Sequence, residues 1–281
     1  MKYRKLAGLI SIALVLAGFA SLATKGLNYG IDFAGGISMD VRSNSADYGI
    51  ADMRRDLAEF RPELQEDNQG NVMIRIGLDI NATDEQQNIV VREINQILGE
   101  RVTFLQTQVV GPKIGSELIR GGMLAIIFAF LMMSIYVWIR YRGGYAVGML
   151  TSLTLDFFLI FGFFSIVGLE FSQAAIAVIL MGVGYSTNDK IVNYDRIAEN
   201  SKKYHKMPTL DLIDLSVNEM LSRTILTSVT TLLVMAALWL FAGNVLGEFA
   251  IAMSFSVIMG SLTSIFVSNT VLVYFKIRDT D

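Results

Sequence analysis

The sequence predicts an integral membrane protein: a bundle of six transmembrane α-helices with one small α+β domain outside the membrane. Of its 281 residues, 53% are hydrophobic and only 17% are charged, whereas soluble domains average about 45–50% and about 25%. The hydrophobic residues form runs long enough to cross a bilayer, and a polar stretch of about 90 residues, the size of a small domain, follows the first run. The chain therefore divides into a first span in residues 1–24, the polar domain in 25–118 and a five-helix bundle in 119–281.

Six segments are apolar over roughly the 20 residues that a helix needs to cross a hydrocarbon core about 30 Å thick. They are Leu6–Ala23, Gly121–Ile139, Ala146–Leu169, Phe171–Tyr194, Ile225–Ala242 and Phe249–Phe275. The fourth is the most polar, and the last is long enough to tilt or to extend beyond the bilayer. A cleaved signal peptide is the alternative for the first run, which has a basic start and ends in small residues; the other five spans would keep their orientation.

Positively charged residues gather at alternate ends of these spans, and this asymmetry sets the orientation. One side of the membrane receives Lys2, Arg4, Lys5, Arg140, Arg142, Arg196, Lys202, Lys203, Lys206, Lys276 and Arg278. The short loops around Glu170 and Glu248, on the opposite side, contain no Lys or Arg. Because cytoplasmic loops are enriched in Lys and Arg, both termini are predicted to be cytoplasmic and residues 25–118 to face outward.

Residues 25–118 have the pattern of a small α+β domain. Periodicity predicts strands at Ile37–Val41, Val72–Ile80 and Arg101–Val110 and helices at Asp47–Phe60 and Asp84–Leu98. This order suggests a ferredoxin-like sheet with helices on one face. The segment contains 15 Asp or Glu against 9 Lys or Arg and no His, which argues against nucleic-acid binding and against a catalytic site. A folded interaction module is the simplest interpretation.

Two glycine-bearing stretches flank this domain. The first includes Gly30, Asp32, Phe33, Gly35 and Gly36, and the second includes Gly111, Pro112 and Gly115. Glycine permits positive φ angles and the close approach of another chain segment, while proline fixes φ. Each stretch is therefore a candidate hinge or interface, although a flexible exit from the membrane explains the first one more simply.

Polar and charged residues inside the spans are the most informative feature of the sequence. An ionisable group near the centre of a spanning helix costs about 2.5–3.5 kcal/mol on insertion scales, so it usually faces a partner or water. Asp189 lies in the fourth span and Arg223 opens the fifth. At 1.5 Å per residue, Asp189 lies roughly 10 Å from the cytoplasmic end, which is the depth expected for Arg223 on the adjacent antiparallel helix.

Asp189 and Arg223 are therefore predicted to pair, and two interpretations of the pair remain open. A proton taken up by Asp189 on one side of the membrane and lost on the other would couple a proton gradient to helix movement. A structural ion pair would only order the bundle. Further polar side chains that could line a hydrated path beside the pair are Tyr185, Asn188, Asn193 and Thr227.

Two other charged residues in the spans have weaker interpretations. Lys190 points about 100° away from Asp189 on a helix and is expected to snorkel to the membrane interface. Asp156, midway along the third span, is a candidate either for a proton relay or for a structural hydrogen bond to a neighbouring helix.

Four motifs occur in order along this six-span plan. They are Gly30–Gly36 (GIDFAGG), Val109–Gly115 (VVGPKIG), Gly184–Asp189 (GYSTND) continued by Tyr194–Asn200 (YDRIAEN), and Arg223–Ser228 (RTILTS). With these motifs the chain resembles, over nearly its whole length, the SecF family of membrane subunits in the bacterial protein-export complex SecDF. The glycine motif alone is weak evidence, but the four in order on this plan make a specific match.

The resemblance implies an RND-like fold in the bacterial cytoplasmic (inner) membrane, with residues 25–118 in the periplasm. It implies SecD as the partner that completes a pseudo-symmetric twelve-span unit and association with the SecYEG translocon, with YajC and YidC as further candidate partners. The implied activity is the use of protons, moved by the proton motive force, to assist the translocation of preproteins.

The resemblance also assigns roles to residues of the fourth and fifth spans. Asp189 falls on the family's proton-carrying aspartate and Arg223 on its partner arginine. Two departures stand out: Lys190 replaces a small or hydroxyl residue, and Leu155 precedes Asp156 where many relatives have histidine. The first bears on the chemistry of Asp189, and the second on any relay through the third span.

Functions of other classes remain as alternatives. An intramembrane aspartyl protease needs a Gly-x-Gly-Asp element, but Gly182-Val183-Gly184 is followed by Tyr185, so neither enzymatic activity nor a catalytic residue is predicted. An RND-type exporter of other substrates usually carries both halves and larger outer domains in one chain, and a non-conducting structural assembly subunit is the third alternative. The absence of Cys excludes disulfides and thiolate metal sites, and no cofactor or metal is expected.

Overall fold

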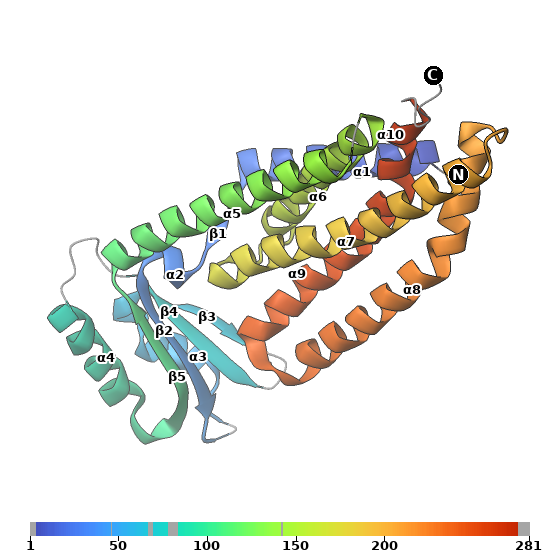
Figure 1. The fold of residues 1–281 in the computed structure, drawn as a ribbon. Helices are drawn as coiled ribbons and strands as arrows, with labels where there is room; N and C mark the ends of the chain where they lie inside the picture. The colour runs from blue at the N-terminus through green and yellow to red at the C-terminus, as the bar shows by residue number, and fades with distance from the viewer. Residues whose placement is uncertain (1–3, 46, 67–69, 78–83, 142, 275–281) are drawn as a thin grey trace. The chain divides into compact units, whose positions relative to one another are not determined.

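The computed structural model describes residues 4–45, 47–66, 70–77, 84–141 and 143–274, which form two compact units (Figure 1). The helical unit comprises Met1–Asn28, Ala125–Glu170 and Ala174–Asp281, and the α+β unit comprises Tyr29–Leu124 with Phe171–Gln173. Helix α5 (Pro112–Arg140) begins in the α+β unit and ends in the helical unit.

The helical unit is built from helices, most of them long and apolar. Besides α5 they are α1 (Arg4–Thr24), α6 (Gly144–Val167), α7 (Gln173–Lys203), α8 (Thr209–Phe241), α9 (Gly243–Leu262) and the short α10 (Asn269–Val273). Four segments are long and apolar enough to cross a membrane: Ile114–Arg140, Gly144–Val167, Thr209–Phe241 and Leu246–Val273. Among the described residues, α7 is not one of these four segments, as its polar sequence leads one to expect. The apolar stretch of α1, Gly8–Thr24, is shorter than each of the four.

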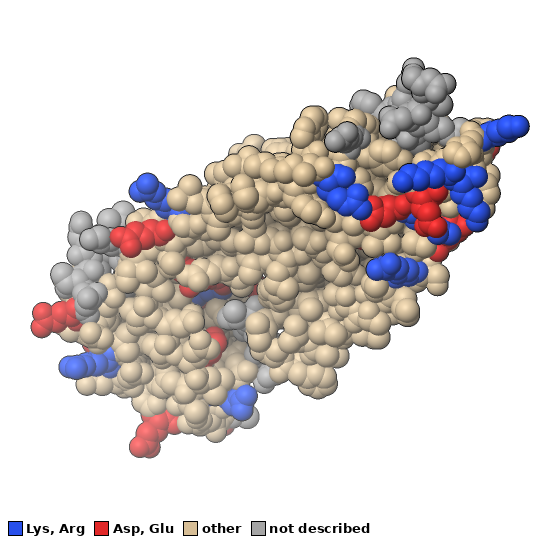
Figure 2. Space-filling view, viewed as in Figure 1, with Lys and Arg blue, Asp and Glu red and all other residues tan. Residues whose placement is uncertain are grey.

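Helix α6 is central to the packing of this unit. It packs against α1 and α9, and α8 packs along α9 (Figure 1). Only 11% of the apolar window of α5 and of α8 is buried, against 44% for α6 and 50% for the segment that contains α9. The apolar surfaces of α5 and α8 are therefore left for lipid or for another protein. Charged side chains gather at the end of this unit where α7 and α8 meet (Figure 2), and Arg196 pairs there with Glu219 at 2.6 Å.

Gly18→Ala is expected to lower the free energy of unfolding by about 1–3 kcal/mol, the usual effect of overpacking. A Cβ on Gly18 of α1 would lie 2.8 Å from the Cα atom of Gly162 on α6, and backbone yields less easily than a side chain. Gly8→Ala on the same helix is the matched control, because nothing lies within 4 Å of its Cβ position. Denaturation of both variants in detergent measures the difference, and equal stability would contradict the close α1–α6 contact.

A π-helical segment, η3 (Thr263–Ser268), interrupts the last predicted span between α9 and α10. The wider turn frees carbonyl groups, and the Asn269 side-chain amide donates to the carbonyl oxygens of Ser264 at 2.9 Å and Ile265 at 3.0 Å. Such segments are frequent at functional sites, and freed carbonyls inside a membrane need partners of this kind. Phe275, the predicted end of this span, lies outside the described residues.

The α+β unit contains a four-stranded antiparallel sheet in the order β3-β4-β2-β5. Its elements along the chain are β2 (Gly36–Ser43), α3 (Ile50–Asp56), the 3₁₀ turn η1 (Ala58–Phe60), β3 (Glu63–Glu66), β4 (Asn71–Ile76), α4 (Asp84–Leu98), the 3₁₀ turn η2 (Gly99–Arg101) and β5 (Val102–Val110). Strands β2, β4 and β5 lie where periodicity predicts them, although residues 78–80 of the predicted second strand are outside the described residues. The prediction lacks β3, because this short edge strand is mostly exposed and has no apolar alternation.

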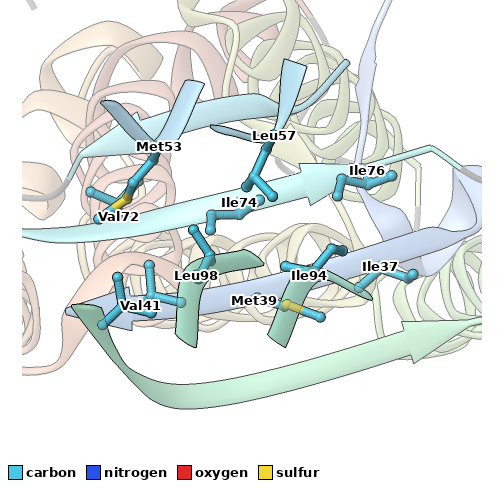
Figure 3. Packing of buried hydrophobic residues seen from close by; sticks show 11 residues of the cluster. Ile37, Met39, Val41, Met53, Leu57, Val72, Ile74, Ile76, Ile94 and Leu98 are labelled. Carbon is cyan, nitrogen blue, oxygen red and sulfur yellow. The ribbon is translucent and has the colours of Figure 1, made fainter. Parts of the chain in front are cut away.

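One face of this sheet forms the core of the α+β unit (Figure 3). Alternate residues of β2 and β4 belong to this core, as the two-residue period of a strand requires, and they meet side chains from the α3 and α4 segments. The labelled residues are Ile37, Met39, Val41, Met53, Leu57, Val72, Ile74, Ile76, Ile94 and Leu98. Both helices therefore cover the same face. Two further pairs of residues, β1 (Asn28–Tyr29) and β6 (Glu170–Phe171), form a separate two-stranded sheet, and the short helix α2 (Ile31–Ala34) follows β1.

Candidate functional site

Helix α7 presents two adjacent charged residues to different helices. Successive residues of a helix point about 100° apart, so Asp189 contacts α8 while Lys190 contacts α6. Asp189 and Lys190 therefore belong to two polar clusters on different sides of α7.

Asp189 has one satisfied carboxylate oxygen and one that is not. The Thr224 hydroxyl on α8 donates to Asp189 Oδ1 at 2.8 Å, and Thr224 is only 2% exposed. Asp189 Oδ2 is buried and has no hydrogen-bond partner among the described residues. An ionised oxygen buried in this way is unfavourable, and a proton, a water molecule or an approaching cation would satisfy it.

The predicted partner Arg223 does not form an ion pair with Asp189 in the described part of the chain. Its side chain is exposed, and the contact with Asp189 is made by the next residue, Thr224. Arg223 is still near enough to act electrostatically on Asp189. The structure thus brings the predicted segment of α8 to Asp189, and the relay role of Arg223 stays a prediction.

The four residues predicted to line a polar path lie in different surroundings. Asn193 is buried, and its Nδ2 donates to Ser264 Oγ of η3 at 2.9 Å. Tyr185 packs against a buried cluster of α8 and α9, with its hydroxyl oxygen buried and without a partner among the described residues. Asn188 is exposed, and the Thr227 hydroxyl donates to carbonyl groups of its own helix. The structure therefore brings Tyr185 and Asn193 into the bundle interior but not Asn188 and Thr227.

The prediction that Lys190 snorkels to the interface is wrong. Lys190 is 0% exposed and forms an ion pair with Asp156, which is 2% exposed. The Ser186 hydroxyl donates to Asp156 Oδ2 at 2.5 Å, and the Thr263 hydroxyl donates to Oδ1. The physical reason is the rotation of α7, which points Lys190 at α6, where a carboxylate provides a closer partner than the membrane interface. Asp156 is thus paired rather than available as an isolated relay carboxyl.

Buried hydrogen bonds continue from this cluster toward the charged end of α7. The Tyr194 hydroxyl donates to the carbonyl of Ser268 at 3.0 Å and accepts from the Ser268 hydroxyl at 2.6 Å. Tyr141 donates to Asp195 at 3.0 Å, and Arg140 pairs with the same Asp195 oxygen at 3.0 Å. Polar groups therefore extend along α7 from the bundle interior to the ion pairs at its end. In the part of the chain that the structure describes, no group of three or more His, Cys, Asp or Glu is placed to hold a metal ion.

The two glycine-bearing stretches meet within the α+β unit. Asp32 Oδ2 accepts a hydrogen bond from the backbone N–H of Gln173, the first residue of α7, at 3.2 Å. The Phe33 ring lies 5.9 Å from the Phe171 ring, and Gly35 and Gly36 have φ angles of 74° and 148°. A Cβ on Gly115 would lie 2.7 Å from the carbonyl oxygen of Phe33. The glycines thus serve close packing and positive φ, and Asp32 satisfies a donor at the start of α7. Gly111 directly precedes α5, and Pro112 is its first residue.

Gly115→Ala is expected to destabilise the α+β unit by about 1–3 kcal/mol, because the added methyl group meets backbone atoms of Phe33 and Asp32. Gly121→Ala is the matched control on the same helix: nothing lies within 4 Å of its Cβ position, and alanine raises helix propensity by about 1 kcal/mol. Limited proteolysis of the two purified variants measures opening of this unit. A Gly115→Ala variant that resists the protease as well as the control does would contradict the close contact between Gly115 and Phe33.

Three residues of the site, Ser186, Thr224 and Thr263, are not predicted from the sequence. A signal for Ser186 was present, because it precedes Lys190 by four residues and thus shares its helix face. Thr224 adjoins the predicted Arg223, but only the packing of α8 decides which of the two reaches Asp189. Thr263 had no local signal, since its contact with Asp156 joins residues far apart in the chain.

Comparison with known proteins agrees with this architecture. The family model of the protein export membrane protein SecD/SecF, C-terminal, matches residues 90–278, and the SecD/SecF GG motif matches residues 20–47. The protein translocase subunit SecF of Rickettsia rickettsii is 37% identical over 99% of this chain and 92% of its own length. The subunit SecF of Cereibacter sphaeroides is 35% identical over 94% of this chain and 85% of its own length.

The solved structure of SecDF from Thermus thermophilus, described as a translocon-associated membrane protein, superimposes with a TM-score of 0.84 at 31% identity. It covers 98% of this chain, which spans 38% of the length of that protein. SecDF in its super-membrane-facing form superimposes with a TM-score of 0.70 at 30% identity. The chain therefore belongs to the SecD/SecF family of protein export membrane proteins, with a SecF-like role in protein translocation.

Proposed function

We propose that this chain uses the proton motive force to assist the translocation of preproteins, and that Asp189 is the group that carries the proton. The observation that carries the proposal is the buried Asp189 Oδ2, which has no hydrogen-bond partner among the described residues. A carboxylate in this state loses its unfavourable buried charge when it binds a proton, while the Thr224 hydroxyl holds its other oxygen in place. Protonation therefore changes the charge of the Asp189 side chain at the contact between α7 and α8.

A helix movement that brings Arg223 to Asp189 would favour loss of that proton. Arg223 is exposed and adjacent to Thr224, so a rotation of α8 toward the 100° that separates successive residues exchanges a hydroxyl contact for an ionic one. One elementary charge moved across 100 mV supplies about 2.3 kcal/mol, which is comparable with the energy of such an exchange. Proton passage and helix movement are coupled in this way, with no catalytic residue, cofactor or metal required; we propose no enzymatic activity.

The proposed topology has six spans, both termini in the cytoplasm and residues 25–118 in the periplasm of a bacterial inner membrane. The Lys and Arg asymmetry of the loops supports the orientation. The β-α-β-β-α-β element order and the antiparallel order β3-β4-β2-β5 support a ferredoxin-like α+β domain. The helical packing and the SecDF likeness support an RND-like bundle.

The proposed partners are SecD, which would complete a twelve-span unit, and the SecYEG translocon, with YajC and YidC as further candidates. Two facts support a partner within the membrane: this chain spans 38% of the SecDF protein that it resembles, and the apolar windows of α5 and α8 are only 11% buried. Translocating preproteins are the proposed cargo.

The test is export into inner-membrane vesicles that contain the complex with Asp189→Asn, measured with and without a proton gradient. Loss of the gradient-dependent part of export, with the complex assembled, is the expected result. Unchanged gradient-dependent export would refute the proposal and favour the role of a non-conducting structural assembly subunit. Normal protein export combined with lost extrusion of small molecules would favour an RND-type exporter of other substrates.

A further inference from the structure

The Lys190–Asp156 pair is enclosed in the interior of the helical unit. Lys190 is 0% exposed and Asp156 is 2% exposed. Asp156 Oδ2 accepts hydrogen bonds from Lys190 and Ser186, and Oδ1 accepts one from Thr263. Both oxygens of this carboxylate are thus satisfied, whereas Oδ2 of Asp189 has no hydrogen-bond partner among the described residues.

The pair joins three segments of the bundle. Asp156 belongs to α6, Lys190 and Ser186 belong to α7, and Thr263 is the first residue of η3. Rotation of α7 about its axis would separate the two charges and leave each of them buried without a partner, which is strongly unfavourable. The pair therefore resists rotation of α7. The orientation of α7 that it fixes is the one in which the adjacent residue, Asp189, faces Thr224 on α8.

We propose that Lys190 is a positioning residue for Asp189: by pairing with Asp156 it fixes the rotation of α7 and keeps its own charge balanced. The inference rests on the proposed proton-carrying role of Asp189. The charged groups that act on Asp189 are Lys190 from its own helix and Arg223 from α8, and the hydroxyls that act on it are those of Thr224 on α8 and Ser264 of η3.

The balance of charge has a direct consequence for proton transfer. An unbalanced ammonium group one residue from Asp189 would attract its carboxylate permanently and compete with a proton for it. With Asp156 in place, the Lys190 charge is neutralised by its partner. Movement of Arg223 then becomes the change of charge to which Asp189 responds. Asp156 accordingly acts as the counter-ion of Lys190, not as a second proton carrier.

The test is an infrared pH titration of the Asp189 carboxyl group in the purified full-length complex with SecD. The band is assigned by its loss in Asp189→Asn. Asp156→Asn leaves the ammonium group unbalanced, and Lys190→Met leaves the carboxylate unbalanced, so the two midpoints are expected to move in opposite directions by about one pH unit each. Asp156→Leu combined with Lys190→Met removes both charges and is expected to restore the midpoint to within about half a pH unit.

Unchanged midpoints in both single variants would overturn the proposal, and so would a double variant shifted as far as either single variant. If neither single variant folds, the double variant tests the proposal alone. A midpoint more than about one pH unit from that of the unsubstituted complex refutes charge balance. A midpoint close to that of the unsubstituted complex supports charge balance. The titration does not depend on export. Gradient-dependent export by Asp189→Asn would therefore refute the proposed function while leaving these midpoints measurable.

Discussion

Asp189→Asn is expected to reduce gradient-dependent export to the level seen without a gradient, while the complex stays assembled. Asparagine keeps the size of the side chain and an oxygen that can accept from the Thr224 hydroxyl, but it cannot take up or release a proton. One charge crossing 100 mV supplies about 2.3 kcal/mol, which corresponds to a bias of about fiftyfold. Removal of the carrier removes this bias, so the expected loss at 100 mV is of that order.

The measurement compares initial rates of export in vesicles before and after an uncoupler is added. Asp211→Asn is the matched control, because Asp211 is exposed in the first turn of α8 and its substitution removes the same charge outside the bundle interior. The control should retain its response to the uncoupler. A response retained by Asp189→Asn as well would place the proton carrier elsewhere in the complex.

Lys190→Met with Asp156 left in place is expected to lower the free energy of unfolding of the helical unit by about 3–5 kcal/mol. The substitution preserves the length of the side chain but leaves a carboxylate, 2% exposed, without its counter-ion. The Ser186 and Thr263 hydroxyls still donate to it and do not supply the missing charge. Adding Asp156→Leu to the same chain removes the unpaired carboxylate and should recover most of the loss, since apolar replacement of a buried pair is often neutral or stabilising.

Denaturation of the purified variants in detergent measures both changes in free energy. Lys202→Met is the control, because Lys202 is an exposed lysine in the last turn of the same helix, and its substitution should leave stability unchanged. Stability of Lys190→Met equal to that of the control would show that the ion pair does not hold the bundle. A double variant less stable than Lys190→Met would show that the two substitutions act separately and not through one pair.

Local chemistry explains why much of this molecule is predictable from its sequence. The apolar runs mark the helices because hydropathy and helical spacing are properties of neighbouring residues. The alternating residues of β2 and β4 mark their strands for the same reason, whereas β3, a mostly exposed edge strand, has no such alternation. The π-helical turn η3 also escapes prediction, because it depends on how Asn269 satisfies carbonyl groups in the folded chain.

Local sequence patterns were enough to predict that Asp189 lies on a helix and that the start of α8 lies near it. The sequence also shows that a carboxylate and a lysine occupy adjacent positions on α7. The neighbour that each side chain meets depends on the folded bundle: Thr224 instead of Arg223 contacts Asp189, and Asp156 contacts Lys190. The physical reason is that the direction of a side chain follows from helix geometry, but its partner depends on the helix packed against that face. That packing joins residues 34 and 35 positions apart, as the two contacts show, and such separation leaves no trace in local periodicity.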